Sequence, residues 1–191
     1  MLEKVPAAVG HALSAVRPGL EKLICADDSV SAPESIIVES TAFGEGEPIP
    51  ARYTEDGEGL SPPLAWTNVP ERAGSVILVI EDADSPTPAP FVHALVFGLP
   101  GGDTDLPAGA LPGKAGPGTI PTLGKNTFRK ARYLPPDPPT GHGPHRYVFQ
   151  VYALEGASTL DGEPEKHDIV EALKGRVAAR GQLIGAYERR G

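Results

Sequence analysis

Acidic, imidazole and phenol side chains gather at the ends of apolar stretches in this sequence. Asp82 ends the run SVILVIED, and Asp84 follows two residues later. His93 lies within FVHALVF, and His145 begins HRYVF with Tyr147 two positions further on. Side chains two residues apart in an extended strand lie on the same face, so each pair is expected to share a face. Groups of these types that converge can transfer protons, bind an anion or hold a metal ion.

Proline-rich loops lie next to these polar groups. The loop DADSPTPAP leads into the stretch that carries His93, and LPPDPPTGHGP leads into the stretch that begins at His145. A rigid loop lowers the entropy lost when a site is held in one geometry. We therefore expect the polar groups on the separate strands to converge, with His142 of the second loop at the rim. The alternative is that each histidine is an ordinary buried side chain with its own hydrogen-bond partner.

The elements that would position these side chains are mostly β-strands. The β-branched and apolar runs that predict strands are SIIVESTAF, SVILVIED, FVHALVFGLP, RYVFQVYAL and GQLIGAYER. Several of them are continuously apolar, as expected of strands buried inside a sandwich. One late helix is predicted over IVEALKGRVAAR, with Asp168 as N-cap and Glu171 at N3. Strands followed by a helix predict a mainly β fold, an antiparallel, Greek-key-like β-sandwich with peripheral helices.

An N-terminal segment precedes these strands. Apolar residues recur every three or four positions from Leu2 to Ile24, which predicts an amphipathic helix that Pro18 kinks or splits. We therefore expect a helical appendage and linker over residues 1–30 and one domain over residues 31–191. The helix is expected to dock either on its own domain or on a second copy of the chain, which would form a homodimer.

Composition and charge exclude several classes of partner. The chain has 191 residues, 40% of them hydrophobic, which suits one domain with a real core. A net charge of −8 without a block of Lys or Arg argues against nucleic acid and anionic membranes as main partners. No apolar run reaches the ~20 residues of a transmembrane segment. The single cysteine, Cys25, allows no internal disulfide, favours a cytoplasmic location and is expected to be structural.

Four motifs in order carry a resemblance to a known family. They are SPPLAWTNVP, SVILVIEDADSP, FVHALVFGLP and GPHRYVFQVYALE. Over residues 36–190 the sequence resembles the phosphatidylethanolamine-binding protein family, in its bacterial or archaeal Raf-kinase-inhibitor-like branch. The resemblance implies a small pocket that takes phosphate, acetate or a phosphoethanolamine head group. The residues that it implies for ligand binding are Asp82, Asp84, Pro86, His93, His145 and Tyr147.

The sequence also departs from the family pattern. Ala83 and Ser85 replace a proline and an alanine of the family's D-P-D-A-P run, and no tryptophan accompanies His93. The only tryptophan, Trp66, is expected in the core. Pro86 is a candidate for a cis peptide bond, because a tight turn there would aim Asp82 inward. Arg129 and Lys130, where smaller residues are common in the family, are expected to be solvated.

Three classes of function follow, and the first is favoured. It is a non-enzymatic ligand-binding or regulatory module that recognises a small anion, or a phosphorylated group on a protein partner, without a cofactor. The second is a hydrolase-type enzyme that uses Asp, His and Tyr, although Ser85 lacks the context of a nucleophile. The third is a metal site of two histidines and one carboxylate, His93, His145 and Asp82. Anion binding should be weak, because charge-assisted bonds of ~1.5–3 kcal/mol each oppose an association cost of at least ~4 kcal/mol.

Overall fold

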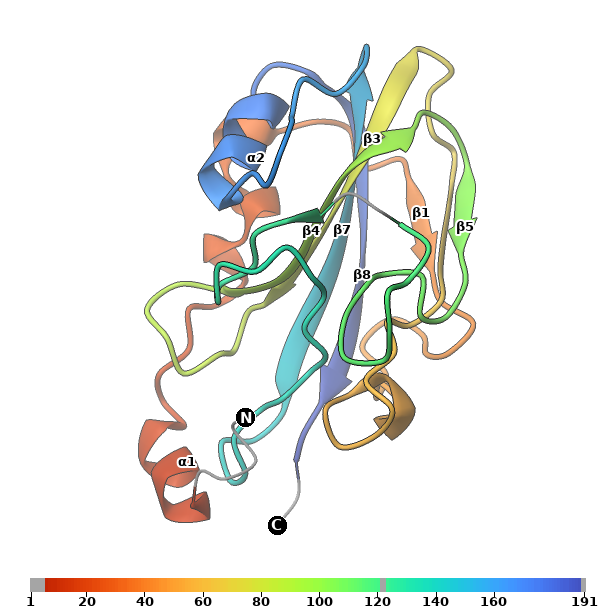
Figure 1. The fold of residues 1–191 in the computed structure, drawn as a ribbon. Helices are drawn as coiled ribbons and strands as arrows, with labels where there is room; N and C mark the ends of the chain where they lie inside the picture. The colour runs from red at the N-terminus through yellow and green to blue at the C-terminus, as the bar shows by residue number, and fades with distance from the viewer. Residues whose placement is uncertain (1–5, 121–122, 190–191) are drawn as a thin grey trace.

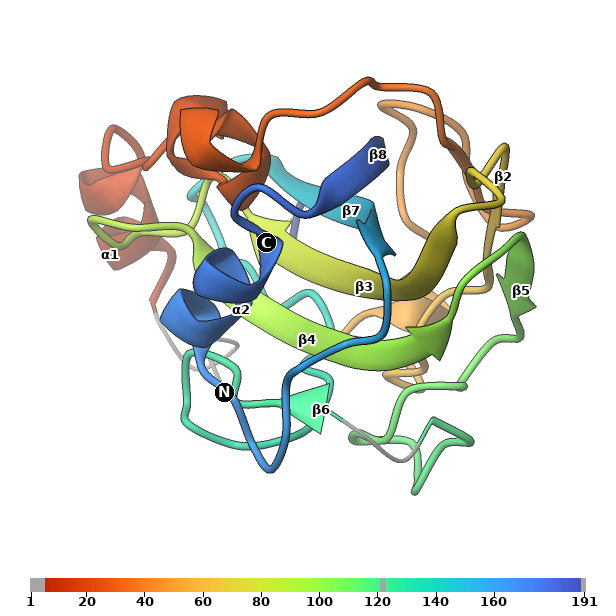
Figure 2. The same ribbon diagram turned by 90° about the horizontal axis from the view of Figure 1, so that it is seen from above.

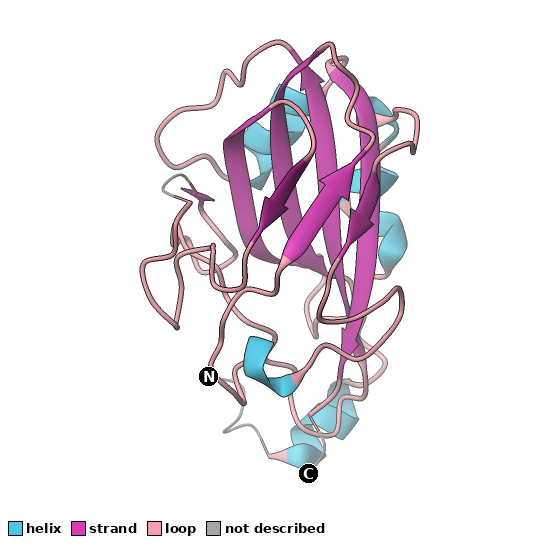
Figure 3. Cartoon of the chain, turned by 90° about the vertical axis from the view of Figure 1, so that its right-hand side faces the viewer, coloured by secondary structure: helices cyan, strands magenta, loops and turns pink. Residues whose placement is uncertain are grey.

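Two antiparallel β-sheets pack face to face in the computed structural model, which describes residues 6–120 and 123–189. The larger sheet has the strand order β6, β4, β3, β7, β8. The bounds of these strands are Leu123–Gly124 for β6, Phe91–Pro100 for β4, Ala73–Asp82 for β3, His145–Glu155 for β7 and Val177–Tyr187 for β8. The smaller sheet places β2 (Leu64–Thr67) between β1 (Ile37–Glu39) and β5 (Thr104–Leu106). Figure 3 shows these three short strands in front of the long ones. The predicted antiparallel sandwich is confirmed.

The core lies on both faces of the large sheet. Leu78 and Ile80 of β3 pack in one cluster with Trp66 of β2, which is 1% exposed as predicted for a core residue. Ile77 and Val79 of the same strand pack in a second cluster on the opposite face. Because both faces of β3 are covered, the strand has no polar face, which explains its continuous apolar sequence.

Two α-helices lie outside the sheets within the described residues. They are α1 (Ala7–Leu13) and α2 (Lys166–Leu173). Figures 1 and 2 show α2 on the face of the large sheet that lies away from β1, β2 and β5. Ile169 and Leu173 of α2 are fully buried in the cluster on that face. Over residues 6–120 and 123–189, no helix has the length and apolar composition needed to cross a membrane.

The start of α2 differs from the prediction, which placed the N-cap at Asp168 and N3 at Glu171. The N-cap is Glu165, whose side chain accepts from the backbone N–H of Asp168. The Asp168 carboxylate in turn accepts from the backbone N–H of Glu165 at 2.8 Å. The helix also ends earlier than predicted, because Gly175 adopts a positive φ of 65° and the chain turns into β8.

The N-terminal segment is one short helix followed by short turns, not the long helix that was predicted. The 3-10 turns of the chain are η2 (Leu20–Lys22), η3 (Ile24–Ala26), η4 (Asp28–Val30) and, further on, η5 (Ala51–Tyr53). The helical path ends before Pro18, and Gly19 then adopts a φ of 88° that favours glycine. Leu2, the first residue of the predicted apolar stripe, lies outside the described residues.

Residues 20–30 pack against the outer face of the large sheet. Ile24 and Val30 are each 1% exposed and belong to the same cluster as α2. The backbone N–H of Ile24 donates to the buried carboxylate of Glu81 at 3.0 Å. These contacts are with the chain's own domain, which was one of the two docking modes left open. The division at residue 30 and the homodimer stay predictions.

Candidate functional site

A cavity of about 400 Å³ lies where β3, β4 and β7 meet the proline-rich loops. Its lining residues are Glu55, Asp82, Ser85, Pro86, Thr87, Phe91, His93, Phe128, Arg132, Leu134, Pro135, Asp137 and His145. Four of the six predicted ligand-binding residues, Asp82, Pro86, His93 and His145, are therefore brought together in one wall. Aromatic, leucine and proline side chains form the apolar part of the lining.

Three buried side chains form a hydrogen-bonded row beside this cavity, which we call the buried triad: Asp82, His145 and His142. The Asp82 Oδ2 and His145 Nδ1 atoms are 2.7 Å apart. The other ring nitrogen of His145, Nε2, lies 2.7 Å from His142 Nδ1. The row ends at the carbonyl oxygen of Leu13 in α1, which lies 2.9 Å from His142 Nε2. All three side chains are at most 6% exposed.

The end of this row fixes the direction of its hydrogen bonds. A carbonyl oxygen can only accept, so His142 Nε2 carries a proton and donates to Leu13. One further proton lies between the two imidazoles, and another lies between His145 and Asp82. Both ring nitrogens of His145 are thus occupied within the protein. His145 therefore lines the cavity but offers no unused ring nitrogen to a ligand in this arrangement.

His93 has one occupied ring nitrogen. Its Nδ1 donates to the carbonyl oxygen of Leu134 at 2.7 Å, and its Nε2 has no hydrogen bond among the described residues. Burial lowers the pKa of His93 below its usual 6.5, although the Asp82 charge opposes this change. A neutral His93 protonated on Nδ1 has an acceptor at Nε2.

Tyr147 lies behind the cavity wall and is not one of the lining residues. Its ring contacts His93 edge-on, with the ring centroids 5.2 Å apart, and stacks on His145 at 6.3 Å. Burial and the Asp82 charge raise the pKa of Tyr147 well above its usual value, so the phenol keeps its proton. Over the part of the chain that the structure describes, the buried hydroxyl group has no hydrogen-bond partner.

Asp84 does not share the face of Asp82, so the predicted two-residue pairing is wrong here. Strand β3 ends at Asp82, and the turn is closed by the backbone N–H of Asp84, which donates to Asp82 Oδ1 at 2.8 Å. The Asp84 carboxylate instead binds the Arg146 side chain at 2.7 and 2.8 Å and pairs with Arg17 at 3.3 Å. Burial raises the pKa of Asp84, but the hydrogen bonds and charge of Arg146 outweigh it and lower the pKa to about 2.

The predicted cis peptide bond at Pro86 is also wrong. The described residues contain no cis peptide bond. The hydrogen bond from the Asp84 N–H to the Asp82 carboxylate closes the turn that a cis proline was expected to form. Pro86 itself lines the cavity.

His142 was predicted at the rim, and this prediction is wrong. The side chain is 1% exposed and forms the end of the buried triad, between His145 and the Leu13 carbonyl oxygen. Two glycines allow the loop to fold back at this point, since Gly141 and Gly143 have φ values of 81° and 90°. The sequence signal was the pair of histidines three positions apart with glycines on both sides of the first. The buried partner of His142, the Leu13 carbonyl oxygen, could not be found from the local sequence.

Three charged groups of the lining were not identified from the sequence. Asp137 pairs with Arg189 at 2.8 Å, and Glu55 pairs with Lys114 at 3.3 Å. Arg132 also lines the cavity, is exposed, and has no ion pair among the described residues. Of the two basic residues singled out in the sequence, Arg129 pairs with Glu165 at 2.7 Å and its side chain is 72% exposed.

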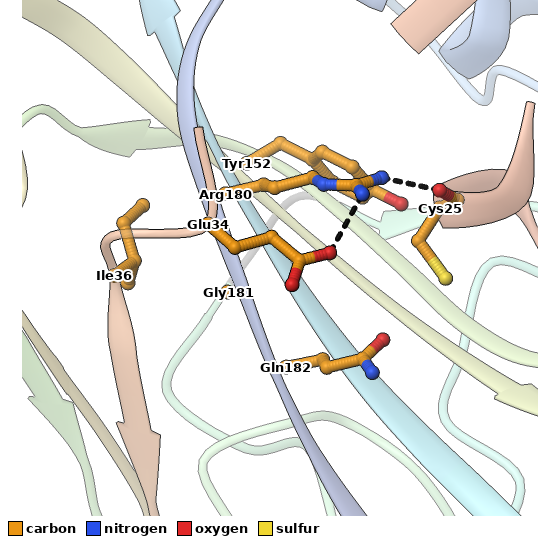
Figure 4. Close-up of a pocket in the computed structure, with 7 residues that line it drawn as sticks. All are labelled: Cys25, Glu34, Ile36, Tyr152, Arg180, Gly181 and Gln182. Atoms are coloured by element: carbon orange, nitrogen blue, oxygen red, sulfur yellow. Dashed lines mark hydrogen bonds and ion pairs between the residues drawn. The ribbon is translucent and has the colours of Figure 1, made fainter. Parts of the chain in front are cut away.

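A second cavity, of about 190 Å³, lies along β8, between η3 and the segment that leads into β1 (Figure 4). Cys25 lines it beside Arg180, which donates to the Cys25 carbonyl oxygen and to Glu34 at 2.6 Å. Burial raises the pKa of the Cys25 thiol to about 11. A thiol of this kind is a weak nucleophile, in line with the structural role predicted for it.

The sequence matches the model of the phosphatidylethanolamine-binding protein family over residues 39–188. It is 39% identical over 153 residues to a UPF0098 protein of Methanothermobacter thermautotrophicus, and the match covers 78% of this chain and 95% of that protein. The chain belongs to the phosphatidylethanolamine-binding protein family. The six predicted site residues and His142 lie within the matched range, whereas Leu13, at the end of the triad, lies outside it.

Two solved structures resemble this member of the phosphatidylethanolamine-binding protein family. A Chlamydia trachomatis protein, described as a homologue of the phosphatidylethanolamine-binding protein, is 34% identical with a TM-score of 0.73, covering 82% of this chain and 99% of that one. YbcL of E. coli, described as a new member of the mammalian family, is 27% identical with a TM-score of 0.72, covering 81% and 98%.

Proposed function

We propose that this chain is a non-enzymatic module that binds a small molecule with an anionic head group. Membership of the phosphatidylethanolamine-binding protein family supports a ligand-binding role in general. The cavity of about 400 Å³ is of the size that small-molecule sites have in proteins. The finer assignment to an anion rests on the His93 imidazole and on Arg132, which both line the cavity.

The observation that carries this proposal is the separation of polar and apolar groups within the cavity. Asp82, His93 and His145 lie together in its wall, and the buried triad holds two of them in place. Phe91 and Phe128 line the same cavity with their ring centroids 5.1 Å apart, in an edge-on contact. A ligand with a polar head and an apolar body would satisfy both parts of the lining. In a zwitterionic head group, the ammonium would pair with Asp82.

A binding role fits these contacts better than catalysis or metal binding. The Ser85 hydroxyl lies 2.7 Å from Thr87 Oγ1 and makes no hydrogen bond to an imidazole among the described residues, so no base activates it. The described residues contain no group of three or more His, Cys, Asp or Glu placed to hold a metal ion. The proposal therefore includes no cofactor and no turnover.

A titration followed by NMR tests the proposal. Phosphate, acetate, O-phosphoethanolamine and phenyl phosphate are added separately while the histidine side-chain signals are recorded. We expect saturable shifts at His93 with dissociation constants from high micromolar to millimolar, because few charge-assisted bonds oppose the cost of association. In Leu134→Trp, the indole would fill the cavity without removing a polar group, and the shifts should be lost.

A matched variant controls for the added bulk in this titration. Glu171→Trp adds the same side chain at a site on α2 that is 67% exposed, far from the cavity, and should bind as the unmodified protein does. Absence of saturable shifts with all four compounds at millimolar concentration would contradict the proposed function. A phosphorylated protein partner and a cytoplasmic location belong to the same proposal, and they rest on the anion site and on the single cysteine.

A further inference from the structure

Apart from the exposed Arg132, the polar groups that line the cavity present acceptors far more than donors. Pro86 and Pro135 have no backbone N–H to offer. The Thr87 hydroxyl donates to the Ala89 carbonyl oxygen at 2.7 Å. The Ser85 hydroxyl, 2.7 Å from Thr87 Oγ1, is left to donate to that oxygen. Both hydroxyl protons are thus used within the loop, so the loop side of the cavity has no free O–H for an anion.

The base of the cavity, formed by carboxylates and histidines, also presents acceptors rather than donors. Asp82 is hydrogen-bonded to His145 and accepts from the backbone N–H of Asp84, and both ring nitrogens of His145 are hydrogen-bonded along the buried triad. The carboxylates of Glu55 and Asp137 also line the cavity and can only accept. An anion that enters with His93 neutral would meet lone pairs of electrons at the base, which is unfavourable.

His93 Nε2 is the one ring nitrogen of the lining that a proton can convert into a donor. The charged and titratable groups that face it come from every neighbouring element. They are Asp82 on β3, His145 and Tyr147 on β7, Arg132 and Asp137 on the loop before β7, and Glu55 after η5. Asp82 favours the protonated imidazole, whereas a positively charged His145 opposes it. A bound anion next to Nε2 would add a second favourable charge.

We propose, on the basis of the function above, that the cavity binds an anion together with one proton, which His93 takes up at Nε2. The bound state is then an imidazolium that donates to the anion from Nε2 and to Leu134 from Nδ1. The ligand class is an organic monoanion with an apolar body, because the exposed Arg132 and this new cation are the positive charges of the lining outside the triad.

The sign of the pH dependence follows from this uptake. Because burial holds the pKa of free His93 below 6.5, the protein at neutral pH must gain the proton when the anion binds. Affinity for the anion should therefore fall about tenfold for each pH unit above that pKa. An ammonium ligand, which donates to neutral Nε2 or to Asp82, should show no such fall.

Calorimetry with benzoate tests the proposal, because the charge of benzoate does not change between about pH 6 and pH 8.5. Titrations in two buffers of different ionisation enthalpy give the number of protons taken up. We expect about one proton per benzoate and about tenfold weaker binding per pH unit. Benzoate that binds with constant affinity and without proton uptake would overturn this inference while leaving the proposed function intact. Failure of benzoate, phosphate and O-phosphoethanolamine to bind at any pH would instead overturn the proposed function, and this inference with it.

Two variants locate the proton. His93→Gln keeps a donor amide that does not titrate, so benzoate binding should become independent of pH and proton uptake should vanish. His167→Gln removes a histidine whose side chain is 74% exposed on α2, and should keep the full pH dependence. Proton uptake that persists in His93→Gln would overturn the assignment to His93. If His93→Gln does not fold, the His93 ring signals of the unmodified protein at about pH 7.5 must show protonation when benzoate is added.

Discussion

His142 is buried although it lies in a loop, and the buried triad explains how. Every hydrogen bond between Asp82, His145, His142 and the Leu13 carbonyl can be made at once with two shared protons. In each arrangement that makes all of these bonds, the positive and negative charges of the triad cancel. Burial of a row without net charge and without an unpaired ring nitrogen costs little desolvation free energy. Because these hydrogen bonds occupy both ring nitrogens of His145, His145 cannot donate to a ligand, and that role is left to His93.

Replacement of His142 by alanine tests this interpretation. His142→Ala would leave His145 Nε2 and the Leu13 carbonyl oxygen unpaired in a buried site, at about 1–3 kcal/mol for each group. We expect the free energy of unfolding, measured with urea at neutral pH, to fall by about 2–6 kcal/mol. His167→Ala, on the exposed face of α2, should change it by less than about 0.5 kcal/mol. Equal losses in the two variants would mean that the triad does not stabilise the fold.

At the scale of elements, α1 and the loop 139–145 form one unit. A Cβ atom at Gly10 of α1 would overlap with the carbonyl oxygen of Thr140 in this loop. The Arg17 side chain donates to the carbonyl oxygens of His142 at 2.6 Å and Pro144 at 2.7 Å. The helix is therefore held by close backbone contact and by the loop that carries His142.

The substitution Gly10→Ala should raise the stability of the protein if α1 is a free helix, and lower it if α1 is packed on the loop. Alanine stabilises a free helix by about 1 kcal/mol relative to glycine. Here Gly10→Ala should instead destabilise the protein, because the new methyl group displaces the loop, and amide hydrogen exchange of residues 140–145 should become faster. Ala12→Gly, at an exposed position of the same helix, should weaken α1 without this effect on the loop. A more stable Gly10→Ala variant would show that α1 is not packed as described.

For the whole molecule, the sequence predicted what depends on local pattern. The run FVHALVFGLP coincides with β4 because an apolar stretch bounded by prolines can be read directly. It did not predict that SIIVESTAF would pair only over Ile37–Glu39, since partners decide where pairing stops. Asp84 left the predicted face because a turn hydrogen bond ended β3. His142 depends on a carbonyl group 129 residues away, which no local pattern contains.

Removal of residues 1–30 tests whether the N-terminal segment is an appendage or part of the core. Ile24 and Val30 would each contribute about 1.5–3 kcal/mol through burial, and Glu81 would lose the N–H that it accepts from Ile24. We expect the free energy of unfolding to fall by several kcal/mol, and a hydrophobic dye to bind the uncovered sheet face. If α1 also mediates a homodimer, light scattering should show that the full chain is a dimer and that the truncated chain is a monomer. If the truncated protein has the same oligomeric state as the full chain, the homodimer through the helix is contradicted. If it has the same free energy of unfolding, the role of residues 1–30 in the core is contradicted. Because Leu13 is removed as well, loss of the triad's last acceptor should accompany the loss of stability.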